Sequence, residues 1–170
     1  MRITDEEMIL SFLAGEGADH LGRFYIDTLD WSDIQLEACH DQIQWIFPLH
    51  EDSKMARVYP VLSPEIVEKA KNDPVILNNL IDAKTRFERF YGIGTYDDRM
   101  KQDRWCRDKN HNLLRITRII RCLRLFGLEK EAKDFYDKVI VVANRCGINK
   151  NTYTYWNMAL NDKVWDSLQA

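Results

Sequence analysis

Two adjacent polar residues, His40 and Asp41, stand in the stretch ACHDQIQWIFPLHED at 38–52, where histidine, cysteine and carboxylate side chains gather. A histidine beside a carboxylate can act as a general base, because imidazole titrates near neutral pH. The same pair could bind a metal, but neighbouring residues on a helix point about 100° apart and cannot easily share one ion. Nucleophilic catalysis has no support either, because Cys39 faces an apolar arc and the sequence contains no G-x-S-x-G motif. We therefore predict no catalytic residue and no metal site, and we keep a small enzyme with His40 as general base as the alternative.

Helical spacing assigns most of this stretch to a protein core. Ser32 and Gln35 form a capping box that predicts a helix start, and Pro48 ends the helix. At 100° per residue, 33–47 carries two apolar arcs, so it should be packed from two sides as a central helix. The first arc holds Leu36, Cys39, Ile43, Ile46 and Phe47, and the second holds Ile34, Ala38 and Trp45.

A second distinctive segment, NHNLLRITRIIRCLRLFGL at 110–128, is apolar on one half of a helix and cationic on the other. Its arginines are Arg115, Arg118, Arg121 and Arg124. They can hold an acidic peptide or small anion, bind nucleic-acid phosphates with Trp105 as a stacking surface, or lie on an anionic membrane. The sequence pI near 5.8 argues against a dedicated nucleic-acid binder. Nucleic acid and membrane surfaces are therefore the less favoured partners.

Charge is distributed unevenly along the chain. Residues 1–60 hold twelve Asp and Glu against four Lys and Arg, whereas 99–133 hold eleven Lys and Arg against four acids. The basic segment is either a docking face for an anionic partner or the counterpart of the acidic first third within one domain.

The composition favours helices over strands. The 170 residues include seven Gly and four Pro, too few for the turns of an all-β fold, and 45% are hydrophobic. We expect an all-α protein, a single compact domain of about seven helices over 1–170, with 33–47 and 75–91 central. Five helices are expected over 21–29, 33–47, 75–91, 111–126 and 129–146. Two more should begin at Thr4 and at Ser63, and the last one or two short helices should lie within 151–168. Residues 48–62 and 92–109 should be an extended connection and an irregular segment.

The cysteines and the ends of the chain suggest an intracellular protein. Cys39, Cys106, Cys122 and Cys146 contain no C-x-x-C pair and read as reduced, buried thiols. The start, MRITDEEMIL, is acidic within five residues and is not a signal peptide. The apolar run at 139–143 is far too short to span a membrane. We expect a cytoplasmic location, no transmembrane segment and no cofactor.

Residues 12–49 (FLAGEGADHLGRFYIDTLDWSDIQLEACHDQIQWIFPL) resemble the conserved N-terminal region of opioid growth factor receptors. That family begins F-x-x-G-x-G-x-D-x-x-G-R, continues with a W-D/S-D element, and reaches L-E-x-x-H-D-x-I-Q-W-L-F-P-L, in which Ile46 here replaces a leucine. The segments RFYG at 89–92 and 110–128 are also similar. The resemblance covers roughly 8–145, and its H-D-x-I-Q-W-x-F-P signature is specific.

The resemblance implies a receptor-like domain. Members of the family bind an endogenous opioid pentapeptide, restrain cell growth and lie around or within the nucleus, so a eukaryotic version would be nuclear or perinuclear. The family proteins carry a long C-terminal tail, whereas this chain stops at residue 170 and looks like a short, tailless member.

No ligand-contacting residue follows from the resemblance, so the site is predicted from the two distinctive segments. We expect a non-enzymatic binding domain for a short peptide or an anion, with a mixed-charge cleft between the segments. Its ligand-binding residues would be His40, Asp41, Gln44, His111, Arg115 and Arg118.

Overall fold

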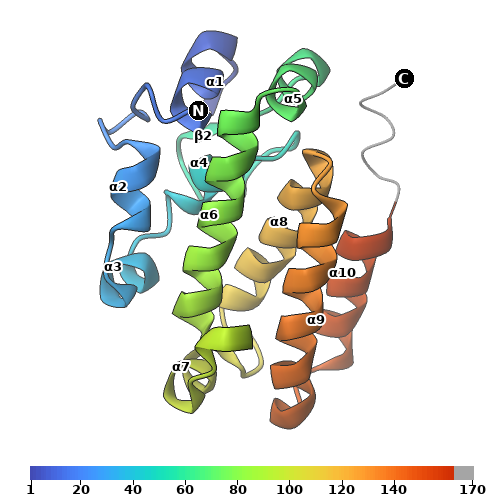
Figure 1. Ribbon diagram of the computed structural model, residues 1–170. Coiled ribbons are helices and arrows are strands. Elements are labelled where there is room, and N and C mark those ends of the chain that lie inside the picture. The colour runs from blue at the N-terminus through green and yellow to red at the C-terminus, as the bar shows by residue number, and fades with distance from the viewer. Residues whose placement is uncertain (163–170) are drawn as a thin grey trace. The chain divides into compact units, whose positions relative to one another are not determined.

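A computed structural model describes residues 1–162 (Figure 1). The chain forms two compact units, one made by Met1–Ala83 and the other beginning at Lys84. Residues 1–162 contain ten α-helices, one short 3-10 helix and two strands of two residues. Seven of the α-helices have seven residues or more, so the expected all-α class is confirmed. The expectation of a single domain stays a prediction.

The first unit is built from short helices whose ends follow local capping rules. Ser63 Oγ accepts the Ile66 N–H at 3.2 Å, and Pro64 occupies the first turn, as the sequence predicts. Asp5, and not Thr4, caps the first helix, because its carboxylate accepts the Met8 N–H at 2.7 Å. The helices are α1 (Glu6–Leu13), α2 (Tyr25–Leu29), α3 (Asp33–Ala38), α4 (Ile43–Ile46), α5 (Pro64–Lys71) and α6 (Pro74–Tyr91), whose last residues belong to the second unit.

The expected continuous helix over 33–47 is wrong. The Ser32–Gln35 capping box is present, but α3 ends at Ala38, and α4 begins only at Ile43. The Asp41 side chain accepts hydrogen bonds from Cys39 and from a distant arginine, and such side-chain contacts compete with helical pairing. The second apolar arc also fails, because Ile34 is 79% exposed.

Aromatic rings form the core of the first unit. Phe12 lies 5.2 Å from Trp45 and 5.5 Å from Tyr25 between ring centroids, and all three side chains are about 1% exposed. The Tyr25 hydroxyl donates to the Ile46 carbonyl at 3.0 Å, which satisfies its polar end. Trp45 and Ile43 are therefore buried as expected, although they lie on the short helix α4 and not on a continuous helix over 33–47.

Two strands were not expected. Strands β1 (Arg2–Ile3) and β2 (Tyr59–Pro60) pair in parallel, with Arg2 opposite Tyr59 and Ile3 opposite Pro60. Each has two residues, too few to show the alternating pattern by which a strand is predicted. The connection 48–62 is otherwise without helix, as predicted.

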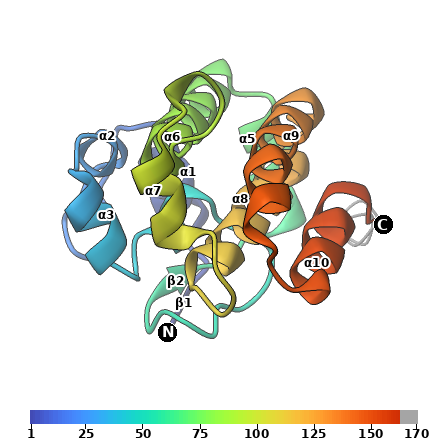
Figure 2. The same cartoon turned by 90° about the horizontal axis from the view of Figure 1, so that it is seen from below.

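The second unit packs α8 against both α9 and α10, and Figures 1 and 2 show these three helices side by side. Trp156 is 0% exposed, and its indole N–H donates to the Leu113 carbonyl at 3.1 Å, which fixes α10 on α8. The elements are the 3-10 helix (Gly94–Tyr96), α7 (Arg99–Trp105), α8 (Asn112–Leu125), α9 (Glu129–Cys146) and α10 (Lys150–Asn161).

The segment 92–109, expected to be irregular, contains α7 and the 3-10 helix. Asp98 caps α7 by accepting the Lys101 N–H at 3.2 Å. Trp105 is 1% exposed and donates to the Tyr91 carbonyl at 2.9 Å, so it is a core residue and offers no stacking surface. Within 151–168, α10 ends at Asn161, and positions 163–168 lie outside the described residues.

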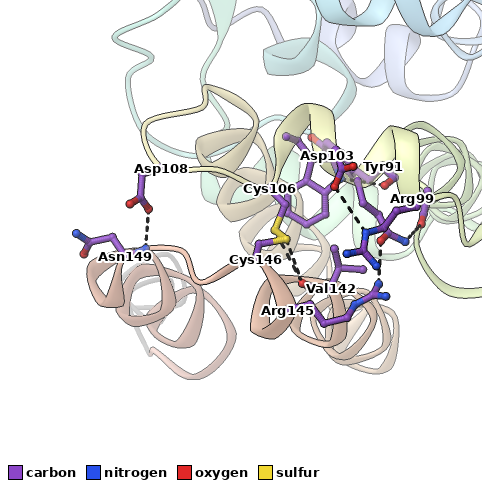
Figure 3. The surroundings of a disulfide bond; sticks show 12 residues. Tyr91, Arg99, Asp103, Cys106, Asp108, Val142, Arg145, Cys146 and Asn149 are labelled. Carbon is purple, nitrogen blue, oxygen red and sulfur yellow. Dashed lines mark hydrogen bonds and ion pairs between the residues drawn. A yellow bond between two sulfur atoms is a disulfide. The ribbon is translucent and has the colours of Figure 1, made fainter.

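A disulfide joins Cys106, just after α7, to Cys146, the last residue of α9, with 6.0 Å between their Cα atoms (Figure 3). The expectation of four reduced thiols is therefore wrong for this pair. Cys39 and Cys122 are not part of a disulfide, and Cys122 is 0% exposed. None of the helices in residues 1–162 has the length and apolar character of a membrane span.

Candidate functional site

A polar cluster in the first unit is centred on Arg23. Its Nε donates to Asp19 Oδ2 at 2.7 Å, and its Nη1 donates to Asp41 Oδ1 at 2.9 Å. The loop between α1 and α2 supplies Asp19, His20 and Arg23, and the break between α3 and α4 supplies Cys39 and Asp41. These five residues are called the Asp41 cluster.

Asp19 holds the loop that presents the arginine. Its Oδ1 accepts the backbone N–H groups of Leu21 and Arg23 at 2.9 and 3.0 Å. The Asp19 side chain is 1% exposed, so its charge is taken out of water, but the ion pair and these hydrogen bonds compensate for that cost. Arg23 is therefore fixed in position before any ligand is present.

Asp41 is the member of the cluster whose carboxylate can be reached from solvent, because 36% of its side chain is exposed. Burial alone would raise the pKa of Asp41, but hydrogen bonds from the Cys39 thiol at 3.0 Å and from Arg23 outweigh it and lower that pKa. Burial, together with the hydrogen bond to Asp41, raises the pKa of the Cys39 thiol. At neutral pH the cluster therefore pairs an ionised carboxylate with a protonated thiol.

Aromatic side chains flank this carboxylate. The His20 ring stacks on Trp45 with 5.6 Å between centroids, and its Nε2 lies 4.0 Å from Asp41 Oδ2. The Arg23 guanidinium lies 5.9 Å from the centre of the Trp31 ring. Two buried donor atoms, Arg23 Nη2 and Trp45 Nε1, have no protein hydrogen-bond partner among residues 1–162. The arrangement can attract a cation at its open carboxylate and place aromatic surface beside it.

The three predicted site residues of the first unit occupy different environments. Asp41 belongs to the cluster, whereas His40 lies exposed beside it in the break between α3 and α4. Gln44 lies in α4 and is 4% exposed, with its Oε1 atom unbonded among the described residues.

The three predicted residues of the second unit lie on or next to α8. His111 is the residue before its first turn and is half-buried. Arg115 is 5% exposed, and its Nη1 donates to Asn112 Oδ1 at 3.4 Å. Arg118 is half-buried. The predicted cleft would need residues of both units, and it stays a prediction.

The arginine face of α8 is less exposed than expected. Arg124 Nε pairs with Glu129 at 3.0 Å, and its Nη1 donates to the carbonyls of Ala159 and Asp162 at 3.1 and 2.9 Å. These contacts join α8 to the start of α9 and the end of α10. Arg115 and Arg124 are thus covered by their own unit and are not a solvent-facing row.

Sequence reasoning missed Asp19 and Arg23 as site residues. Their spacing of four and the G-x-D-x-x-G-R pattern around them were visible in the sequence, but nothing local ties them to Asp41, which lies eighteen residues beyond Arg23. Among residues 1–162 there is no group of three or more histidine, cysteine or acidic side chains placed to hold a metal ion.

Comparison with known proteins gives the family. Residues 6–165 match the family described as the opioid growth factor receptor (OGFr) conserved region. The human opioid growth factor receptor is 31% identical over 159 residues, which cover 82% of this chain and 23% of that protein. The mouse receptor is 34% identical over 136 residues, covering 71% and 21% respectively. Mouse opioid growth factor receptor-like protein 1 is 32% identical over 107 residues, covering 56% and 22%.

The chain thus spans less than a quarter of the length of these curated relatives. No solved structure matches it. The Asp41 cluster lies inside the matched region and contains Asp19 and Arg23 of the G-x-D-x-x-G-R pattern together with Asp41 of the His-Asp pair. On the strength of this match over 6–165, the chain belongs to the opioid growth factor receptor family.

Proposed function

We propose that this chain is a non-enzymatic binding domain that takes a short peptide at the Asp41 cluster. The relatives are named as receptors for an opioid growth factor, which supports a binding role. The observation that carries the proposal is the ionised, partly exposed Asp41 carboxylate, fixed by Arg23 and flanked by aromatic rings.

The chemistry of the cluster suits the amino end of a peptide. A free α-ammonium group carries a positive charge and three N–H donors, which match a carboxylate with an open side. His20 and Trp31 lie around Asp41 and Arg23 and can contact an apolar or aromatic peptide side chain. A charge-assisted hydrogen bond of this kind contributes about 1.5–3 kcal/mol, which corresponds to roughly ten- to hundred-fold in affinity.

The other predicted site residues differ in how far they can take part in this proposal. His40 is exposed next to Asp41 in the chain and can contact the ligand directly. Arg118 and His111 belong to the second unit, and their role as ligand contacts stays a prediction. Gln44 is 4% exposed, so we assign it a supporting role beneath the cluster, whereas Arg115, 5% exposed in the second unit, is given no role in it. The alternative in which His40 is a general base is disfavoured, because Asp41 is already bonded to Arg23 and Cys39.

Isothermal titration with an opioid pentapeptide tests this function. We expect the wild type to bind it, Asp41→Asn to bind at least about ten-fold more weakly, and Asp30→Asn, which removes an exposed acid of the same unit, to bind unchanged. Equal binding by Asp41→Asn and the wild type would contradict the proposal.

A second experiment changes the peptide and keeps the wild-type protein, so a folding defect of the variant cannot explain its result. The N-acetylated pentapeptide lacks the ammonium group, so the wild type should bind it about as weakly as Asp41→Asn binds the free peptide. Undiminished binding of the acetylated peptide, or a preference for inorganic phosphate over the peptide, would overturn the assignment of Asp41.

A further inference from the structure

Two links tie three segments together at one end of the second unit. The Cys106–Cys146 disulfide joins the end of α7 to the end of α9, and the Asp108 carboxylate accepts the Asn149 N–H at 2.6 Å, just before α10 (Figure 3). We call residues 104–109 and 145–150 the clamped end. Both links hold the loop after α7 against the α9–α10 turn.

The clamped end carries a strong excess of positive charge. Its exposed cations are Arg104, Arg107, Lys109, Arg145 and Lys150, and its one acidic residue is Asp108. Arg107 donates to the Arg104 carbonyl at 3.3 Å, and Arg145 donates to Gln102 Oε1 at 2.8 Å. Both acceptors are neutral, so these bonds orient the guanidinium groups and leave their charge in place.

Lys109 has an unusual backbone conformation. Its φ of +65° is the one positive value of a non-glycine residue in 1–162. The left-handed region costs an L-residue roughly 1–2 kcal/mol, a cost that glycine avoids. Such strain persists where the surroundings impose it and is frequent at functional sites. Here a lysine occupies the strained position next to Asp108, inside the clamp.

An aromatic ring lies close to these cations. Tyr153 follows Lys150 by three residues on α10, so the two side chains point about 60° apart and lie about 4.5 Å apart along the helix axis. The Tyr153 ring is half-exposed and packs edge-on against Trp156 at 6.0 Å, which holds it in place. Tyr155, two residues further along α10, is 60% exposed but points about 160° away from Tyr153, so it is not counted with this surface.

We propose that the clamped end is a docking surface for single-stranded nucleic acid. Five cations on three segments suit an extended polyanion better than one small anion, and the Tyr153 ring suits the stacking of a base, which an acidic protein segment does not need. This surface shares no residue with the arginine face of α8, where Arg124 pairs with Glu129, or with the Asp41 cluster.

Fluorescence anisotropy with a labelled oligonucleotide of about 15 nucleotides tests the proposal on the full chain. The variant K109E/K150E reverses two charges of the clamped end. The control K54E/K130E makes the same change in net charge at exposed lysines elsewhere; Lys130 lies at the opposite end of α9 from Arg145, roughly 22 Å away.

We expect the wild type to bind at low salt, with the logarithm of affinity falling linearly with that of salt concentration. K109E/K150E should bind at least about ten-fold more weakly, with a salt slope smaller by about 1.4, because each lost phosphate contact removes about 0.7. K54E/K130E should stay within about two-fold of the wild type. Equal losses in both variants, no binding at low salt, or equally tight binding of polyglutamate would each overturn the proposal.

Discussion

Replacing Cys106 and Cys146 by serine should lower the free energy of unfolding by about 4 kcal/mol. The bridge closes a loop between residues 40 positions apart in the chain. In the chain-entropy relation, a loop of this size removes about 13 cal/mol/K from the unfolded ensemble, which is about 4 kcal/mol at 25 °C. Domains of this kind are stable by only about 5–15 kcal/mol, so the loss should be plain in a urea titration.

Tryptophan fluorescence in urea, with and without dithiothreitol, provides the assay, since the chain has five Trp. Dithiothreitol should move the wild-type midpoint to that of C106S/C146S and leave the variant unchanged. The control Cys39→Ser keeps the bridge and should respond to dithiothreitol as the wild type does. The reasoning is refuted if the unfolded, unreduced protein titrates four free thiols and not two, or if reduction leaves the wild-type midpoint in place.

Three further changes test the second unit. Lys84→Met should lower the free energy of unfolding by about 3 kcal/mol, because the buried Lys84 ammonium lies 2.6 Å from Asp134. The exposed Lys69→Met should cost under about 1 kcal/mol in the same urea titration. Burial alone would raise the pKa of Asp134, but Lys138 and Lys84 lower it overall. Its stabilisation is therefore present above the unfolded pKa of about 4 and is lost as pH falls through the folded pKa. Midpoints measured from pH 7 to pH 3 should fall less steeply in Asp134→Asn, and parallel curves would contradict this. Gly147→Ala should cost about 1 kcal/mol in thermal unfolding, because Gly147 has φ of +69°; an unchanged melting temperature would refute it.

The parts of the fold that depend on neighbouring residues were predictable. The helix 129–146 has the bounds that its apolar spacing and Gly147 predict, and Ser63 with Pro64 starts α5 as expected. These signals act over three or four residues, so they do not depend on contacts with distant parts of the chain.

Features that depend on distant residues were not predictable. The break at 39–42 requires Arg23, eighteen residues before Asp41, and the disulfide requires α7 and α9 to end at the same place. In the candidate site the sequence singled out Asp41, the residue with an open carboxylate. It missed Arg23, because a single charged residue in a loop gives no sign of its partner.

The states of the four cysteines leave Cys39 as a position where the natural sequence can be labelled chemically. Two cysteines are bonded, and Cys122 is 0% exposed with its pKa raised by burial, so a maleimide or iodoacetamide reagent has only Cys39 to alkylate in the folded chain. The Cys39 sulfur lies 3.0 Å from Asp41 Oδ1. A fluorophore or spin label attached there at alkaline pH sits beside that carboxylate without any engineered mutation. The rate of alkylation itself would then report whether an added compound shields this spot.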